Sequence, residues 1–161
     1  MPAELTVEEV RAQAEAFVLR EALLADENRY DDWEALWTDD GVYWVPLGDG
    51  DYDPTLRTSI IHDDRNRIGQ RIERLKSGDA HVQYPPSRLR RLVSNFEVEI
   101  DGEEVVVYSN FICVEARNGI ETWAGRTVHR LRREGDGLRM ALKKVLLVNN
   151  DHELPALGFL I

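Results

Sequence analysis

Three short turn signals divide the second half of this chain, and they constrain its fold more than any other feature. They are Asp101-Gly102, Asn118-Gly119 and Gly135-Asp136-Gly137. Asn-Gly between apolar runs is among the strongest sequence signals for a tight hairpin. The runs between these turns alternate apolar and polar residues or are rich in β-branched residues, as expected of strands. We therefore predict an antiparallel meander with strands over residues 95–100, 105–116, 120–132 and 138–149.

The first half of the chain has helical patterns instead. Thr6 and Glu9 have the spacing of a capping box, and apolar residues then recur at helical intervals. We predict helices over residues 7–28, over 33–37 with Asp31 or Asp32 as the cap, and from near Asp63 to Ser77, with a strand over 42–45 and a loop over 47–57. Helices followed by a meander indicate an α+β fold in which helices cover one face of a curved sheet. Residues 1–161 are expected to form a single domain, with residues 1–5 as a flexible N-terminus.

Composition excludes several classes of protein. The formal net charge is −10, and residues 1–79 carry all of it, with 19 acidic and 9 basic side chains. Such a surface repels nucleic acid. No apolar run approaches the roughly 20 residues that cross a bilayer, and the N-terminus lacks the pattern of a secretory signal. A single cysteine permits no internal disulfide, so we expect a cytoplasmic protein.

Metal and nucleophile motifs are weak. The series Asp49, Asp51, Asp53 starts like a calcium loop, but Pro54 and Ile60 occupy the positions of the required glycine and glutamate, so we predict a solvated acidic loop. The four histidines, none of them paired at ligand spacing, are His62, His81, His129 and His152. A Rieske cluster needs two cysteines and is excluded from this chain. Cys113 lies between Ile112 and Val114 and is expected to be buried and inert.

Acid–base chemistry inside the fold is the main catalytic alternative. The side chains that could point into a pocket under a curved sheet are Tyr30, Asp31, Tyr43, Asn110 and His129. Burial there would shift their pKa values toward catalytic use. The competing interpretation makes Asp31 a helix cap and His129 and the aromatic residues parts of the core.

Basic side chains gather where the meander begins. Residues 79–91 are predicted to form a loop, and Arg88, Arg90 and Arg91 follow a double proline in a stretch without acids. Arg126 is predicted on the outer face of a strand whose other face carries His129. Together with the apolar segment 157–161, which includes Phe159, these arginines have the composition of a subunit contact. We predict that Arg88, Arg90, Arg91, Arg126 and Phe159 take part in one.

An ordered set of motifs resembles the small (β) subunit of bacterial aromatic-ring-hydroxylating dioxygenases. The motifs are YDDWEALWTDD from Tyr30, YWVP from Tyr43, DDR from Asp63, SRLRRLVSN from Ser87, AGR from Ala124 and KKVLLVNND from Lys143. The resemblance extends from Glu15 to Ile161. It implies the cone-shaped α+β fold of nuclear transport factor 2, ketosteroid isomerase and scytalone dehydratase.

The resemblance also implies a role. In that family the α subunit carries the Rieske [2Fe–2S] cluster, the mononuclear iron and the substrate pocket, and the β subunit is mainly structural. It implies no cofactor and no catalytic residue in this chain, a homotrimer of β subunits, and an α3β3 complex with the catalytic α subunit. The alternative is a stand-alone isomerase, dehydratase or cyclase of the same fold that uses Tyr30, Asp31, Tyr43 or His129, with no resident metal.

Overall fold

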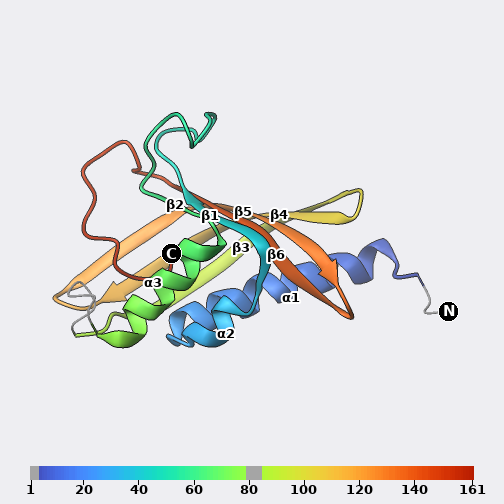
Figure 1. Ribbon diagram of the computed structural model, residues 1–161, viewed down its shortest axis with the longest axis horizontal. Coiled ribbons are helices and arrows are strands. Elements are labelled where there is room, and N and C mark those ends of the chain that lie inside the picture. The colour runs from blue at the N-terminus through green and yellow to red at the C-terminus, as the bar shows by residue number, and fades with distance from the viewer. Residues whose placement is uncertain (1–3, 79–84) are drawn as a thin grey trace.

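One six-stranded sheet organises the molecule (Figure 1). The computed structural model describes residues 4–78 and 85–161. The strands are β1 (Trp37–Val45), β2 (Ile61–Asp63), β3 (Arg88–Asp101), β4 (Glu104–Ala116), β5 (Ile120–Glu134) and β6 (Gly137–Leu147), and the helices are α1 (Val7–Asp26), α2 (Tyr30–Glu34) and α3 (Arg65–Ser77). The sheet order is β2-β1-β6-β5-β4-β3. The three helices lie on one side of the sheet, as predicted.

Local chemistry sets the helix ends. The Thr6 hydroxyl accepts a hydrogen bond from the Glu9 amide while the Glu9 carboxylate accepts from the Thr6 amide, so the predicted capping box starts α1. Asp64 caps α3 by accepting from the Arg67 amide. Gly78 ends α3 at φ 76°, a left-handed conformation that favours glycine. Of the predicted flexible terminus, residues 1–3 lie outside the described chain, while residues 4 and 5 are exposed and precede the helix.

The meander β3–β6 is antiparallel throughout, as the turn signals predict. A bulge between Ser94 and Glu97 interrupts the pairing of β3 with β4, and Asn95 there has φ 57°. β1 lies parallel to β6, whereas the sequence suggested an antiparallel sheet. Gly125 allows β5 to approach β6, because a Cβ there would overlap the carbonyl oxygen of Leu146.

Several predicted boundaries are wrong. The strands predicted over 42–45 and 95–100 begin earlier, at Trp37 and Arg88, and β2 was not predicted. The second helix is Tyr30–Glu34, capped by Arg29 without a side-chain hydrogen bond, so Asp31 and Asp32 lie in its first turn and cap nothing. Trp37, predicted to be helical, begins β1. The loop predicted over residues 79–91 ends earlier, since β3 begins at Arg88 and includes the arginines. Residues 79–84 of that loop lie outside the described chain.

The core fills the space between the helices and the inner face of the sheet. Trp33, Trp37 and Tyr43 form an aromatic cluster with ring centroids 5.5–6.1 Å apart. The segment after β6 turns back under the sheet and buries its last three residues, Phe159, Leu160 and Ile161, against this core (Figure 1). The apolar segment 157–161, which the sequence analysis assigned to a subunit contact, is therefore largely covered by its own chain.

Candidate subunit interface and closed interior

A buried ion pair occupies the interior between α1 and the sheet. The Lys143 ammonium on β6 lies 2.6 Å from Oε1 of Glu21 on α1, and both side chains are 3% exposed. Nε1 of Trp33 donates a second hydrogen bond to the same oxygen at 2.7 Å. His129 of β5 completes the cluster, with Nε2 3.5 Å from Oε2 of Glu21. Because buried charges require partners, these contacts account for both ions.

The charges of this cluster follow from burial and from the neighbouring groups. Burial opposes ionisation of Glu21, but Lys143, His129 and Arg91 together outweigh it and hold the pKa of Glu21 well below its usual range. Burial lowers the pKa of His129, so the imidazole is neutral at pH 7. His129 is buried, as predicted, but neither ring nitrogen has a hydrogen-bond partner among the described residues. Burial also raises the pKa of Tyr43.

A second buried pair joins β3 to α1. Arg91, whose side chain is 4% exposed, donates through Nε to Asp26 at 2.7 Å, and the Arg91 amide donates to the same carboxylate at 2.9 Å. Its guanidinium also donates to the Leu160 carbonyl at 2.8 Å. The Tyr43 hydroxyl donates to the Ile161 carbonyl at 2.8 Å and accepts from the Ile161 amide at 3.0 Å. These bonds hold the segment 157–161 in the mouth of the interior.

The cavity between α1 and the sheet, as lined by described residues, is too small for a substrate. The cavity beside Glu21, His129 and Lys143 measures about 10 Å³, which is about the space of one water molecule. Of the predicted acid–base residues, Tyr43 and His129 are buried here, but Asp31 is a surface residue paired with Lys76 at 2.8 Å. Tyr30 is half-buried in α2, and burial raises its pKa. Asn110 lies on the outer face of β4 and is exposed.

Sequence reasoning missed Glu21, Asp26 and Lys143. A signal existed for Lys143, because it shares an inward face with Val145 and Leu147 on an alternating strand. Glu21 likewise stands seven residues after Ala14 on the buried side of α1. A charged residue at an inward position predicts a buried partner of opposite charge.

The remaining arginines lie on the outer face of the sheet. Arg90 pairs with Glu27 at 3.0 Å while remaining 72% exposed, and Arg126 pairs with Glu97 at 2.8 Å. The backbone of Arg88 pairs with Ala116 of β4, while its side chain forms no ion pair or hydrogen bond with a described residue. The structure thus supplies acids from this chain for Arg90, Arg91 and Arg126. Whether any of the five predicted residues also contacts another chain stays a prediction that one chain alone does not test.

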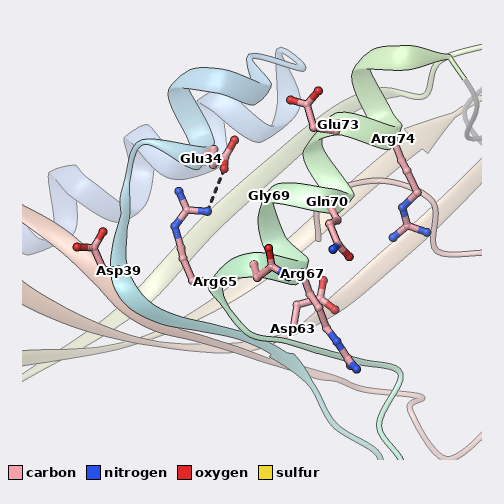
Figure 2. A pocket seen from close by; sticks show the side chains of 10 residues that line it. Glu34, Asp39, Asp63, Arg65, Arg67, Gly69, Gln70, Glu73 and Arg74 are labelled. Carbon is pink, nitrogen blue, oxygen red and sulfur yellow. Dashed lines mark hydrogen bonds and ion pairs between the residues drawn. The ribbon is translucent and has the colours of Figure 1, made fainter.

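An open groove of about 1230 Å³ lies beside α3 (Figure 2). Its walls are mostly charged, and Arg65 from α3 donates to Glu34 of α2 across its floor at 2.9 Å. Asp63 at its edge is paired with Arg71 at 2.7 Å. Such an open, polar surface differs from the enclosed and largely apolar pockets that bind small substrates.

The described residues also show no site for a metal ion or for a reactive cysteine. Within residues 4–78 and 85–161, no three side chains of histidine, cysteine, aspartate or glutamate gather to hold a metal ion. Asp49 and Asp53 of the acidic loop instead accept hydrogen bonds from the Asp51 and Thr55 amides. Burial raises the pKa of the Cys113 thiol to about 11, so this cysteine is inert, as predicted. None of the described helices is long and apolar enough to cross a membrane.

Known proteins similar to this chain identify its family. The family model described as ring hydroxylating beta subunit matches residues 20–152. This chain belongs to that family. It is 36% identical over 141 residues to the small oxygenase component of the p-cumate 2,3-dioxygenase system of Pseudomonas putida, covering 85% of this chain and 78% of the relative. It is 28% identical to the small subunit of 2-halobenzoate 1,2-dioxygenase of Burkholderia cepacia, covering 84% and 86%.

Solved structures confirm the fold. The β subunit of benzoate 1,2-dioxygenase from Burkholderia mallei superimposes with a TM-score of 0.76 at 23% identity, over 98% of this chain and 99% of that chain. An NTF2-like protein with a cystatin-like fold from Novosphingobium aromaticivorans gives 0.63 at 15% identity, over 86% and 82%. The predicted fold and family are therefore correct.

Family membership fixes the role of the chain. It is a structural and assembly subunit of a ring-hydroxylating dioxygenase. In this family the β subunit partners with a catalytic α subunit, which carries the Rieske cluster and the iron. The comparisons support this role and not the stand-alone enzyme.

Proposed function

We propose that this chain forms a cytoplasmic homotrimer that supports three catalytic α subunits in an α3β3 dioxygenase acting on an aromatic carboxylate. The family match over residues 20–152 carries the assignment. The substrate class rests on the relatives, whose names specify p-cumate and 2-halobenzoate. We also propose that residues 1–161 form one domain, which is supported by the continuous sheet and core.

The closed interior supports a structural role for the described chain. The buried charges inside the fold are paired with one another, as the Glu21–Lys143 and Asp26–Arg91 contacts show. These two ion pairs fix α1 against the sheet, and this packing keeps the outer face of the sheet in one shape. We propose that Arg88, Arg90 and Arg126 on this face contact a neighbouring subunit, while Arg91 and Phe159 support the face from inside.

Purification of the chain with and without an α subunit tests this proposal. The chain alone is expected to form a trimer, to contain no iron and to show no turnover. Co-expression with a Rieske-type α subunit of the same organism is expected to give a larger complex that contains iron. With its reductase, that complex should oxidise p-cumate or benzoate faster than naphthalene. Turnover by the chain alone would refute the assembly role, and a preference for naphthalene would refute only the substrate class.

A further inference from the structure

The outer face of the meander carries an exposed apolar patch. Leu92 on β3 pairs with Ile112 on β4, and these side chains are 76% and 51% exposed. Val114 follows on the same face of β4, two residues along. Across the next strand, Ala124 of β5 pairs with Ile112, and Val148 donates its amide to the Ala124 carbonyl. Because neighbouring strands lie about 4.8 Å apart, these side chains form one continuous surface. A contiguous exposed apolar patch on a soluble protein indicates an interaction site.

The patch has a basic border. The outward residues of β3, β4 and β5 in this region are Arg88, Arg90, Leu92, Ser94, Asn110, Ile112, Val114, Ala116, Ile120, Thr122, Ala124 and Arg126. They include three arginines and no acid, and the acids that meet Arg90 and Arg126 come from the margin. If two copies of this face packed against each other, their arginines would face one another and repel. The patch therefore favours a different, acidic surface over a two-fold contact with itself.

This chain also presents a surface of the complementary kind. The loop between β1 and β2, residues 46–60, projects away from the sheet (Figure 1). Leu56 in this loop is 85% exposed, the most exposed large apolar side chain in the described residues. Asp49, Asp51 and Asp53 of the same loop are also exposed. An apolar side chain beside exposed carboxylates matches an apolar patch bordered by arginines.

The loop is held in shape before any contact forms. The Tyr52 hydroxyl accepts from the Leu47 amide at 2.9 Å and donates to the Thr58 carbonyl at 3.2 Å, which ties the two ends of the loop together. Asp53 accepts from both the amide and the hydroxyl of Thr55, directly before Leu56. A fixed loop loses little conformational entropy on binding, so its exposed leucine can act as an anchor.

We propose that the acidic loop of one copy, with Leu56 as its anchor, docks on the Leu92–Ile112–Val114 patch of a second copy. The contact is head-to-tail, since it joins two different surfaces, and head-to-tail contacts form rings such as a trimer when the rotation between copies closes. This inference rests on the homotrimer proposed above and assigns its two contacting surfaces. We assign a second copy of this chain as the partner of the patch, because the loop 46–60 of this chain is the acidic and apolar surface that the patch requires.

Two single variants test the contact. Leu56→Asp alters the loop, Leu92→Glu alters the patch, and both positions are exposed, so folding should be retained. Leu19→Glu, at an exposed apolar position of α1, is the matched control. Light scattering after size exclusion, over a range of concentrations, gives the mass of each, and circular dichroism checks folding. Each variant should raise the concentration for half-assembly by roughly tenfold or more, while the control stays like the wild type.

Mixing the two variants tests the head-to-tail geometry. The Leu56→Asp copy keeps an intact patch and the Leu92→Glu copy keeps an intact loop, so one contact can form. The mixture should give a 1:1 dimer of about 37 kDa, twice the chain mass of 18.5 kDa, although each variant alone is monomeric. Ile112→Thr, which keeps a β-branched residue in the strand, replaces Leu92→Glu if the latter misfolds.

The outcomes separate this inference from the function it rests on. Trimeric variants, or monomeric variants that do not combine, would overturn the assigned surfaces alone. Variants that stay trimeric but no longer bind the α subunit would assign the patch to the α subunit instead. A wild-type chain that is monomeric at every concentration would overturn the homotrimer, and the contact with it.

Discussion

Replacing Lys143 by methionine tests the buried ion pair most directly. The variant keeps most of the side-chain volume but removes the ammonium 2.6 Å from Glu21, which leaves a buried carboxylate with Trp33 as its remaining close donor. Breaking a buried pair by removing one partner costs about 3–5 kcal/mol. For a chain of this size, this corresponds to a decrease in melting temperature of roughly 6–20 °C.

The pH dependence of stability should also change in the variant. In the wild type the pKa of His129 lies below its unfolded value, so stability falls as pH decreases below about 6.5. Lys143 is the strongest of the contacts that lower the pKa of Glu21, so its removal should raise that pKa by leaving burial less opposed. A Glu21 that takes up a proton more readily loses its buried charge as pH falls, so the destabilisation should shrink at lower pH. The deficit of Lys143→Met should therefore be larger at pH 8 than at pH 5.5.

Urea unfolding followed by tryptophan fluorescence, at equal protein concentration, measures both effects. The double variant Glu21→Gln/Lys143→Met removes both charges and keeps an acceptor for Trp33, so it should recover most of the lost stability. A free energy of unfolding for Lys143→Met within 1 kcal/mol of the wild type at pH 8 would refute the reasoning, as would a double variant no more stable than the single one.

Three further predictions concern other parts of the fold, and urea unfolding measures each. His129→Gln should remove much of the stability decrease between pH 6.5 and 5, to which one histidine contributes at most about 1.4 kcal/mol per pH unit, and an unchanged slope would assign the decrease to other groups. Gly125→Ala should cost about 1–3 kcal/mol because its Cβ meets the Leu146 carbonyl, whereas Gly137→Ala, whose Cβ meets nothing within 4 Å, should stay within about 0.5 kcal/mol of the wild type; equal effects would contradict this. Arg91→Leu should cost about 3–5 kcal/mol because the buried Asp26 carboxylate loses its cation and keeps only the backbone amide of residue 91 as a donor. Arg90→Ala, at an exposed pair, should cost at most about 1 kcal/mol, and the opposite order would show that burial does not decide the contribution.

The parts of the fold that the sequence predicted depend on nearby residues. The hairpin at Asn118-Gly119 and the caps of α1 and α3 need only short-range contacts, and all three are present. Trp33 and Trp37 are four residues apart, which suits one helix, but Trp37 pairs with Met140 of β6 instead. That pairing joins residues far apart in the chain, so local spacing could not reveal it.

The site was harder to predict for the same reason. The Glu21–Lys143 pair joins residues 122 positions apart. The sequence places each on an inward face but does not show that the two faces meet. Arg91 looked like its neighbour Arg90, yet strand alternation turns the first inward to Asp26 and leaves the second in solvent. The composition of the segment revealed a cluster of arginines. It did not show which arginine is buried in the core and which lies on the surface, because that depends on where each side chain points.

The two edges of the sheet have a consequence for how copies of this protein can associate. On β3, Asp26 already accepts the Arg91 amide hydrogen and the bulge at Asn95 breaks the regular ladder, while β2 at the other edge has only three residues. Such edges resist the strand-to-strand pairing that leads to fibres and amyloid. Chains that meet through side chains instead can stop at a small, closed number of copies, even at high protein concentration.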